Sequence, residues 1–412
     1  MAVTGPHFST VTEFRDAVNI EDLRFFRVKA PVRINIARRE MTFAPGDIYL
    51  FSPATYALMP QQYFEEVPGP RELLHRPYRG GDLNGRRVLV VRSGGIGDLL
   101  FIQPSLRYLK KKYPGVRFSF GTAATNMAMV AAWDWVAEVF PLPLSLSQLE
   151  QCDYFMNLFG LIEYCREAES KNAYRLFADF FGLPELSEEY LRPVMAPKKP
   201  RLRQIQKVLP RLGLRPGYVY VQIRASSINR TPPLSIFFVL FEKLLAQGLQ
   251  VVICDQAADS VKMDLIVSAF GDIQRAKKSS QADRSGGLVN LSPYSHDLQD
   301  MTAIISQSGF VIAPDSSSLH IAGGLGLPFY GLFTSFPAEL RVATYPHGHW
   351  NRTEHDPGIC ARGGRNCFLH SDAVCPCLED QRPRCFLRQI DVDDIVATVR
   401  QYLAAGGKKL QK

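Results

Sequence analysis

The sequence predicts an α/β protein in which two Rossmann-like domains face each other across a cleft, preceded by a small β-rich module. Three observations predict it. From about Arg86 onward, short apolar runs alternate with segments of helical periodicity, which is typical of a parallel sheet covered by helices. A strand, a turn and a helix follow one another twice, starting at Val88 and at Tyr218. The region before Arg86 instead shows short alternating runs separated by turn residues.

Length and composition agree with this organisation. The chain has 412 residues, 46% of them hydrophobic, which is enough for two or three domains with sizeable cores. We expect a module and linker over residues 1–82, one Rossmann-like domain over 83–197 and a second over 198–412. No apolar run reaches the roughly 18 residues that span a bilayer, and the N-terminus lacks the apolar stretch of a signal peptide. The predicted location is cytoplasmic, with peripheral contact at the inner face of the membrane as an option.

The formal net charge of +8 indicates an anionic partner, either a phosphorylated ligand or an anionic surface. The basic residues are scattered, and no long Lys/Arg block precedes the short tail with Lys408 and Lys409. We therefore expect no nucleic-acid partner; a nucleic-acid-binding α/β protein is a rival argued from charge alone, and it would require salt-sensitive binding.

Four short strands are predicted in the N-terminal module, with a turn at Pro45–Asp47. They cover Arg24–Val28, Val32–Ile36, Met41–Phe43 and Ile48–Phe51. Nothing in this module indicates chemistry.

The first Rossmann-like domain begins with the wholly apolar strand Val88–Val91, as expected for a strand buried on both faces. A glycine-rich turn follows, and Asp98 is expected to open a helix that ends near Tyr113. Later strands are expected at Val116–Phe120, Val136–Phe140 and Tyr154–Leu158, and helices at Thr125–Ala132 and Ala173–Phe181.

A linker over Pro193–Pro200 is expected to lead into the second domain. Its strands are expected at Tyr218–Ile223, Gln250–Cys254, Phe310–Ala313 and Phe329–Phe333, and its helices at Ile236–Gln247, Leu298–Gln307 and Ser317–Leu325. In such folds, ligands bind at the carboxyl ends of the strands.

The first candidate site is the turn with Gly94, Gly95 and Gly97, because glycines let a ligand approach the backbone and a helix N-terminus favours anions. Leu100 replaces the third glycine of a dinucleotide fingerprint, so a nicotinamide-dependent dehydrogenase is disfavoured. Asp98 has two readings. It could cap the helix, which its spacing alone favours, or it could act as a general base.

The second candidate site is the strand-to-helix corner at Asp315. Hydroxyls, free backbone amides and the helix dipole there all favour a phosphate. Its candidate residues are Asp315, Ser316, Ser317, Ser318 and His320. Asp315 or a serine could instead only cap the helix, and His320 could be a histidine satisfied within the core. The small residues that follow could serve close packing or close approach of a ligand.

A third group follows the first strand of the second domain. Arg224 and Arg230 could neutralise a diphosphate through charge-assisted hydrogen bonds, with Ser226 between them. Either arginine could equally be an ordinary solvated side chain.

Together these segments resemble the family 9 glycosyltransferases, the ADP-heptose:lipopolysaccharide heptosyltransferase group. The resemblance runs from about Arg86 to Phe336: GGIGDLLFIQPSL resembles the family's amino-terminal signature, and APDSSSLHIAGGLGLPFYGLF its carboxyl-terminal one. It implies a GT-B fold and an inverting, metal-independent transferase without a catalytic cofactor, in which Asp98 is the base. It also implies that the Asp315 corner binds the donor, with Arg230 standing where the family often has a lysine near the diphosphate.

The resemblance implies ADP-heptose as donor and a glycan, lipid-linked or protein acceptor. The sequence departs from the family's pattern in four features. Asp315-Ser316-Ser317 replaces the usual Asp-Thr-Gly and Arg230 replaces the typical lysine, and the N-terminal module and the cysteine segment (residues 360–385) are not part of the lipopolysaccharide enzymes. A non-catalytic nucleotide-sugar-binding or assembly protein on the same fold is the alternative.

The eight cysteines form two groups. Cys152, Cys165 and Cys254 stand in apolar surroundings, and we expect them in the core. The other five crowd the segment 360–385: Cys360, Cys367, Cys375, Cys377 and Cys385. They suffice for a structural zinc or iron site, although free thiols remain an open alternative. Some relatives that modify protein hold an iron atom on a cysteine cluster near this position, so the resemblance keeps a protein acceptor open as an alternative.

Overall fold

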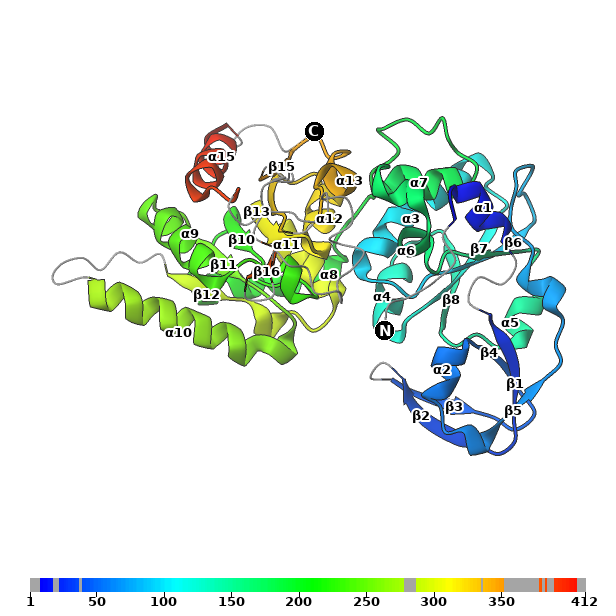
Figure 1. The fold of residues 1–412 in the computed structure, drawn as a ribbon. Helices are drawn as coiled ribbons and strands as arrows, with labels where there is room; N and C mark the ends of the chain where they lie inside the picture. Colours follow the sequence, from blue (N-terminus) through cyan, green and yellow to red (C-terminus); the bar gives the residue numbers. More distant parts are fainter. Residues whose placement is uncertain are drawn as a thin grey trace. The chain divides into compact units, whose positions relative to one another are not determined.

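The computed structural model describes residues 8–17, 22–36, 39–277, 287–334, 336–351, 378–379, 382–383 and 389–405. The chain divides into two compact units, Val3–Leu191 and Arg192–Lys412 (Figure 1). Each unit contains a parallel sheet covered by helices, and the first also contains a small antiparallel module. The predicted α/β class with two Rossmann-like domains and a β-rich N-terminal module is confirmed.

The described part of the N-terminal module, blue in Figure 1, contains five strands. Three form an antiparallel sheet in the order β4-β1-β5, and β2 and β3 form a hairpin. The bounds are β1 Arg24–Val28, β2 Val32–Ile36, β3 Arg39–Phe43, β4 Ile48–Phe51 and β5 Phe64–Val67. The four predicted strands are confirmed, and β5 is additional.

Adjacent phenylalanines in β1 serve two different cores, because successive side chains of a strand point to opposite faces. Phe26 packs within the module, in edge-on contact with Phe51. Phe25 packs instead with Leu89, Val91 and Phe155 of the parallel sheet. The module and that sheet therefore share one hydrophobic core.

The parallel sheet of the first unit has the strand order β8-β7-β6-β9. Its strands are β6 Arg87–Val91, β7 Arg117–Thr122, β8 Val136–Pro141 and β9 Tyr154–Asn157. Helices α3 (Ile96–Lys112) and α7 (Ala173–Phe180) pack on each other through edge-on contact of Phe101 with Tyr174. The shorter helices of this unit are α1 Val11–Asp16, α2 Pro53–Ala57, α4 Met127–Val130, α5 Leu146–Glu150 and α6 Leu161–Tyr164.

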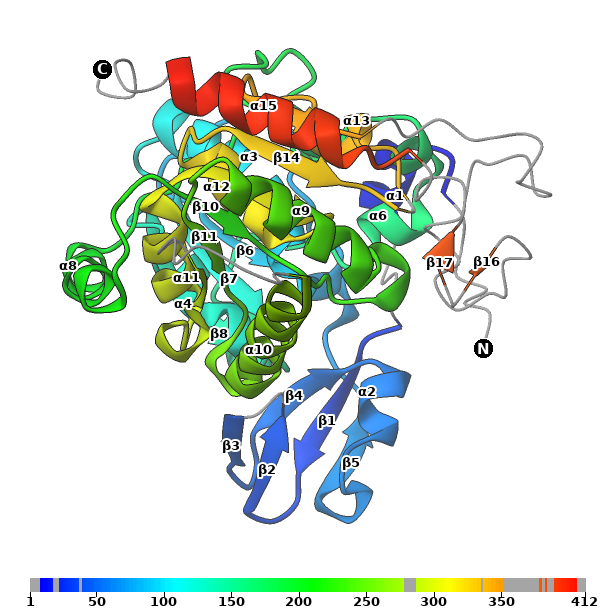
Figure 2. The same ribbon diagram turned by 90° about the vertical axis from the view of Figure 1, so that its left-hand side faces the viewer.

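The second unit has a six-stranded parallel sheet in the order β12-β11-β10-β13-β14-β15. The strands are β10 Tyr218–Val221, β11 Val251–Ile253, β12 Leu288–Asn290, β13 Ser308–Pro314, β14 Phe329–Leu332 and β15 Gly348–Trp350. Figure 2 looks onto α9, α10 and α15 in front of this sheet. The helices are α8 Lys199–Val208, α9 Leu234–Ala246, α10 Ser260–Lys277, α11 Leu298–Ser306, α12 Ser317–Gly324, α13 Glu339–Val342 and α15 Val392–Ala405. A two-residue pair, β16 (Leu378–Glu379) with β17 (Arg382–Pro383), completes the described elements.

Two expectations from the sequence differ in detail. The predicted linker at Pro193–Pro200 overlaps α8, which already begins at Lys199. The helix expected over Thr125–Ala132 is reduced to one α-helical turn, α4, after a short 3₁₀ segment. The three cysteines predicted in the core, Cys152, Cys165 and Cys254, are buried, as expected.

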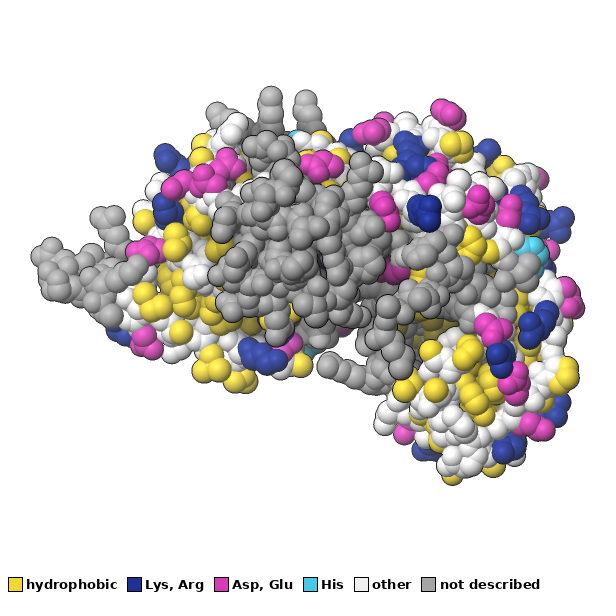
Figure 3. Space-filling model, in the orientation of Figure 1, with side chains coloured by type: hydrophobic (Ala, Val, Ile, Leu, Met, Phe, Trp, Pro, Cys, Tyr) yellow, Lys and Arg dark blue, Asp and Glu magenta, His cyan; other side chains and the backbone are white. Residues whose placement is uncertain are grey.

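The visible surface shows basic and acidic side chains interspersed over both units (Figure 3). On this face, the basic side chains of the described residues do not gather into one patch. Within the described part of the chain, no helix is both long and apolar enough to cross a membrane.

Candidate functional site

The glycine-rich turn after β6 fixes the carboxylate of Asp98 at the start of α3. Gly95 is the N-cap residue, and Asp98 is the third residue of the helix, so the expectation that Asp98 itself opens the helix is wrong. The Gly95 N–H donates to Asp98 Oδ2 at 2.9 Å, which satisfies one of the free amides at the helix start. Gly97 lies within the first turn.

Arg92, at the end of β6, holds the same carboxylate oxygen. Its Nη2 lies 3.2 Å from Asp98 Oδ2 and 2.9 Å from Glu163 Oε1, and its Nη1 donates to the Leu158 carbonyl at 2.9 Å. The Arg92 side chain is only 2% exposed. Burial lowers the pKa of Arg92, but the charges of Asp98 and Glu163 more than offset it and raise that pKa above its usual value. The guanidinium is therefore a permanent cation beneath the carboxylate.

Gly94 leaves the space that the carboxylate occupies. A Cβ at this position would lie 2.1 Å from Asp98 Oδ2 and 2.8 Å from Arg92 Nε, so any side chain would displace the pair. At Gly95 a Cβ would meet the same oxygen only at 3.9 Å. Asn126, after β7, donates from Nδ2 to the Gly94 carbonyl at 3.0 Å and fixes the turn from its other side.

These contacts leave one oxygen of Asp98 available for chemistry. Both the Arg92 and the Gly95 contacts fall on Oδ2, and Oδ1 has no contact of this kind with a described residue. The side chain is 24% exposed. A partly exposed carboxylate whose described contacts all fall on one oxygen has an arrangement that suits a general base. Asp98 thus supports the helix start and remains a candidate base.

In the second unit, the loops after β10 and β13 meet because these two strands are neighbours in the sheet. Arg230 Nη1 lies 3.4 Å from Asp315 Oδ2, and Arg230 Nε donates to Ser227 Oγ at 3.0 Å. Arg230 also donates to Ser226 Oγ. The structure therefore brings together Arg230, Ser226 and Asp315.

Ser316 is the N-cap residue of α12, yet its side chain makes no capping hydrogen bond. Its Oγ is buried and has no hydrogen-bond partner within the described residues. Ser317 begins the helix. A helix start whose amides receive no side-chain cap is suited to an anion.

Ser318 and His320 point into the core instead. Ser318 Oγ donates to Gln222 Oε1 at 3.3 Å, and His320 Nδ1 lies 3.1 Å from the Tyr345 hydroxyl. His320 is only 2% exposed. Of the two readings of His320, these contacts favour the core histidine.

The small residues of α12 serve close packing. A Cβ on Gly323 would lie 2.3 Å from the Tyr345 ring, and one on Gly324 would lie 2.6 Å from the Met195 side chain. Of the two readings left open for these residues, the contacts favour packing within the unit.

Arg224 is separated from the Arg230 group by its own acidic partners. Its Nη2 lies 2.7 Å from Asp255 Oδ2 and 2.8 Å from Asp259 Oδ2. Burial lowers the pKa of Arg224, but hydrogen bonds and charge from Asp255 and Asp259 raise it overall. Two carboxylates already compensate its charge, so Arg224 is a weaker candidate for binding a diphosphate than Arg230.

The cysteine segment, with Cys360, Cys367, Cys375, Cys377 and Cys385, lies outside the described residues. Within the described ranges, no group of three or more His, Cys, Asp or Glu side chains is arranged to hold a metal ion.

Sequence reasoning missed Arg92, Glu163 and Asn126, whose contacts organise the Asp98 turn. A signal was present for Arg92 alone, because a charged residue directly after a wholly buried strand has to find a partner. Glu163 and Asn126 are distant in sequence from the turn, and only the fold brings them to it.

Residues 168–347 match the model of glycosyltransferase family 9 (heptosyltransferase). This span includes Arg230 and Asp315 and begins after the Asp98 turn. No curated protein matches the chain in sequence.

Solved structures share the fold at low sequence identity. The glycosyl transferase family 9 protein of Veillonella parvula is 11% identical with a TM-score of 0.58, over 79% of this chain and 99% of that one. The ADP-heptose lipopolysaccharide heptosyltransferase II of E. coli is 15% identical with a TM-score of 0.52, over 77% of this chain and 99% of that one. The dodecameric iron-containing heptosyltransferase TibC of enterotoxigenic E. coli, solved with ADP-D-β-D-heptose, is 12% identical with a TM-score of 0.51, over 93% of this chain and 91% of that one. The match to the family model, on a fold shared with these structures, confirms the predicted resemblance to the family 9 glycosyltransferases and supports a glycosyltransferase enzyme.

Proposed function

We propose that the protein is an inverting glycosyltransferase that needs no metal for catalysis and moves heptose from ADP-heptose to a hydroxyl of a glycan, lipid-linked or protein acceptor. The observation that carries the proposal is the state of Asp98, held through Oδ2 by Arg92 and the Gly95 amide while Oδ1 stays available. The family description supports heptose as the sugar, and TibC in complex with ADP-D-β-D-heptose supports ADP-heptose as the donor.

In the proposed reaction, Asp98 Oδ1 takes the proton of the acceptor hydroxyl while the hydroxyl oxygen forms a bond to the anomeric carbon. The bond from that carbon to the diphosphate breaks on the opposite side, so the configuration inverts and ADP leaves with the bonding electrons. Arg230 and the uncapped amides at the start of α12 offset the negative charge that develops on the diphosphate. These groups are fixed before the reaction begins, so little reorganisation is needed in the transition state.

The test is a screen of nucleotide sugars, with ADP-heptose first, read by thermal shift and by mass spectrometry of the products. We expect ADP-heptose to stabilise the protein and to be consumed. The variant Asp98→Ala should lower turnover by about 10²- to 10⁴-fold, because the proton acceptor is lost. It should leave ADP binding nearly unchanged, because the contacts that are lost with it, to Arg92 and the Gly95 amide, lie in the first unit, whereas Arg230 and Asp315 belong to the second. Undiminished turnover in Asp98→Ala would exclude this residue as the base. Binding without consumption, even with acceptor extracts, would favour the non-catalytic alternative.

We also propose a structural iron or zinc on the cysteine segment, a role in which a metal saturated with thiolates takes no part in the reaction. The iron-containing TibC, which matches most of this chain in fold, supports iron. Metal analysis of the purified protein should then find about one equivalent, lost in Cys375→Ser together with Cys377→Ser. A metal-free protein that retains full activity and thermal stability would contradict this proposal.

A further inference from the structure

A pocket of about 260 Å³ lies in the first unit at the carboxyl ends of all four strands of the parallel sheet. Each of these strands, or the segment after it, contributes lining residues. From the sheet they are Val91, Ser93, Ala123, Ala124, Leu142, Pro143, Leu144, Phe155, Asn157 and Phe159, and from the module Leu23, Leu50, Ser52 and Thr55.

The module forms the second wall of this pocket and is fastened to the sheet beside it. The Leu50 N–H donates to the Leu144 carbonyl at 2.9 Å, and Tyr49 pairs with Ser145 as an isolated bridge. Leu50 and Leu144 also belong to the core that the module shares with the sheet. The pocket therefore exists only where the module and the sheet are joined.

The pocket adjoins the turn that holds the candidate base. Val91 and Ser93 flank Arg92, and Ser93 directly precedes Gly94, whose missing side chain makes room for the Asp98 carboxylate. Directly after the neighbouring strand β7, Ala123 and Ala124 line the pocket three and two residues before Asn126, which donates to the Gly94 carbonyl. A group inserted in the pocket would thus lie against the Asp98 turn.

The lining suits an apolar group and not a sugar ring. Among the described residues that line the pocket, none has a charged side chain, and their polar atoms are few. Ser52 Oγ is already engaged with Thr55, at 3.2 Å from the Thr55 amide and 3.1 Å from its hydroxyl, and Asn157 Oδ1 accepts from the Phe159 N–H at 3.1 Å. A sugar would lose hydrogen bonds to water here without replacing them, which is unfavourable.

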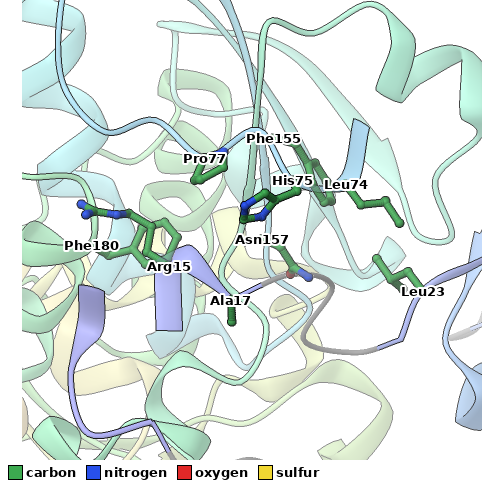
Figure 4. Close-up of a pocket in the computed structure, with 9 residues that line it drawn as sticks. All are labelled: Arg15, Ala17, Leu23, Leu74, His75, Pro77, Phe155, Asn157 and Phe180. Atoms are coloured by element: carbon green, nitrogen blue, oxygen red, sulfur yellow. The ribbon is translucent and has the colours of Figure 1, made fainter. Parts of the chain in front are cut away.

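The size also restricts the occupant. The volume lies just below the roughly 300–1,000 Å³ of small-molecule sites, so the pocket suits one side chain and is small for a lipid with several acyl chains. A neighbouring cavity that shares Leu23, Phe155 and Asn157 does not extend it usefully (Figure 4). That cavity, into which His75 also faces, has a volume of only about 20 Å³, enough for about one water molecule.

We propose that this pocket is a specificity subsite for a polypeptide acceptor, and that it takes one apolar side chain, such as leucine or phenylalanine, close to the hydroxyl that receives the sugar. The inference rests on the proposed function. It adds to that function the acceptor class, a polypeptide, and the group that the enzyme recognises, one apolar side chain near the hydroxyl. The extra N-terminal module thereby acquires a role, because it supplies Leu50, Ser52 and Thr55 to the subsite.

The experiment uses acetylated glycine peptides that contain a single serine, with leucine, aspartate or glycine placed in turn at each of the two positions on either side. Transfer from ADP-heptose is followed by mass spectrometry with the full-length protein. At one position or more, leucine should raise kcat/KM roughly tenfold to a hundredfold over glycine, as expected for burial of one such side chain. Aspartate at that position should abolish the gain.

The matched variants are Ala124→Phe, which fills the pocket, and Thr125→Phe, whose exposed neighbouring position lies outside the lining. Ala124→Phe should remove the preference for leucine, and Thr125→Phe should retain it. Peptides with benzoylphenylalanine at the preferred position should crosslink to residues 91–93 or 142–144 without any donor, so this readout does not depend on transfer. Failure of ADP-heptose consumption with intact crosslinking would count against the proposed function alone.

Three results would overturn the subsite. Leucine, aspartate and glycine peptides could react equally well, crosslinks could fall outside the lining, or the preference could survive Ala124→Phe. If lauroyl-glycine bound in the pocket and no peptide did, the pocket would be assigned to an acyl chain. That result would contradict the proposal in the same way.

Discussion

The buried guanidinium of Arg92 lies 3.2 Å from the same oxygen of Asp98 that accepts the Gly95 amide. Because both contacts use Oδ2, they fix the orientation of the carboxylate without covering Oδ1. Arg92 touches no reacting atom in this arrangement. It is a positioning residue that acts through Asp98.

Replacing Arg92 with methionine should therefore lower kcat more than it changes donor affinity. We expect at least a tenfold decrease in kcat, with the dissociation constant of ADP within about twofold of the wild-type value, since Asp98 would lose its orientation while the second unit is untouched. Arg92→Lys keeps the positive charge but lacks the several donors of the planar guanidinium, and it should recover part of the lost kcat. Steady-state kinetics and ADP titration, with thermal unfolding to verify the fold, measure this. An equal loss of ADP binding in Arg92→Met would indicate a structural role instead.

The two adjacent glycines offer a sharper comparison. In Gly94→Ala the new methyl group would lie 2.1 Å from Asp98 Oδ2, whereas in Gly95→Ala it would lie 3.9 Å away. Gly94→Ala should lower turnover by at least tenfold, and Gly95→Ala far less, although both remove a glycine from the same turn. The measurement is the turnover number of each purified variant. If both variants lost turnover to a similar extent, the conformational freedom of the backbone would matter here more than space for the carboxylate.

Arg230→Ala should weaken the binding of ADP by about tenfold or more, because a charge-assisted contact to the diphosphate is lost. Arg201→Ala is a matched control: its arginine is exposed to a similar extent, 38% against 34%, and also pairs with aspartate, Asp297, in the same unit. Isothermal titration with ADP should leave the control within about twofold of the wild type. Equal affinity in Arg230→Ala would remove this residue from the donor site.

Stability should depend on pH through His349, which joins β15 to α15 by a contact of 2.9 Å between its Nε2 and the Tyr402 hydroxyl. Burial lowers the pKa of His349, against the opposing charge of Asp394, and His347 lowers it further. The unfolded chain therefore binds a proton at higher pH than the folded one. Stability from this group is complete above the unfolded pKa of about 6.5 and is lost as the pH falls through the folded value.

Urea unfolding between pH 7.5 and 5 measures this dependence. His349→Gln should flatten the decrease in midpoint toward low pH, because glutamine can still reach Tyr402 but takes up no proton. A curve of unchanged slope in this variant would assign the acid sensitivity to other groups.

Much of the fold could be predicted because its signals are local. Wholly apolar runs such as Val88–Val91 and Tyr218–Val221 form strands buried on both faces, and their bounds follow from the sequence within a few residues. The helix expected from Thr125 was too long, because its apolar residues serve a single turn and the following loop. Strand β5, which pairs with β1 from across the module, carries only a weak pattern of its own.

In the candidate site, too, the residues marked by a local pattern could be predicted, and the roles that depend on long-range contacts could not. Asp98 and Asp315 could be selected because each stands at a strand-to-helix corner. The inward direction of His320 and the pairing of Arg224 with Asp255 and Asp259 depend on contacts between segments far apart in the chain. Hydroxyl, imidazole and guanidinium groups have the same appearance in a sequence whether they face a ligand or a neighbouring side chain.

The backbone hydrogen bond between Leu50 and Leu144 has a consequence for protein engineering. Since Phe25 and Leu50 cover Leu89, Val91 and Phe155, the module cannot be exchanged as an independent cassette. A chimera that contains the corresponding module of a relative would have to contain these sheet residues of the relative as well. Otherwise, hydrophobic surface would be exposed to solvent, and the chimera would tend to aggregate. Any transplant of acceptor preference would therefore have to move the covering strands and the sheet face beneath them together.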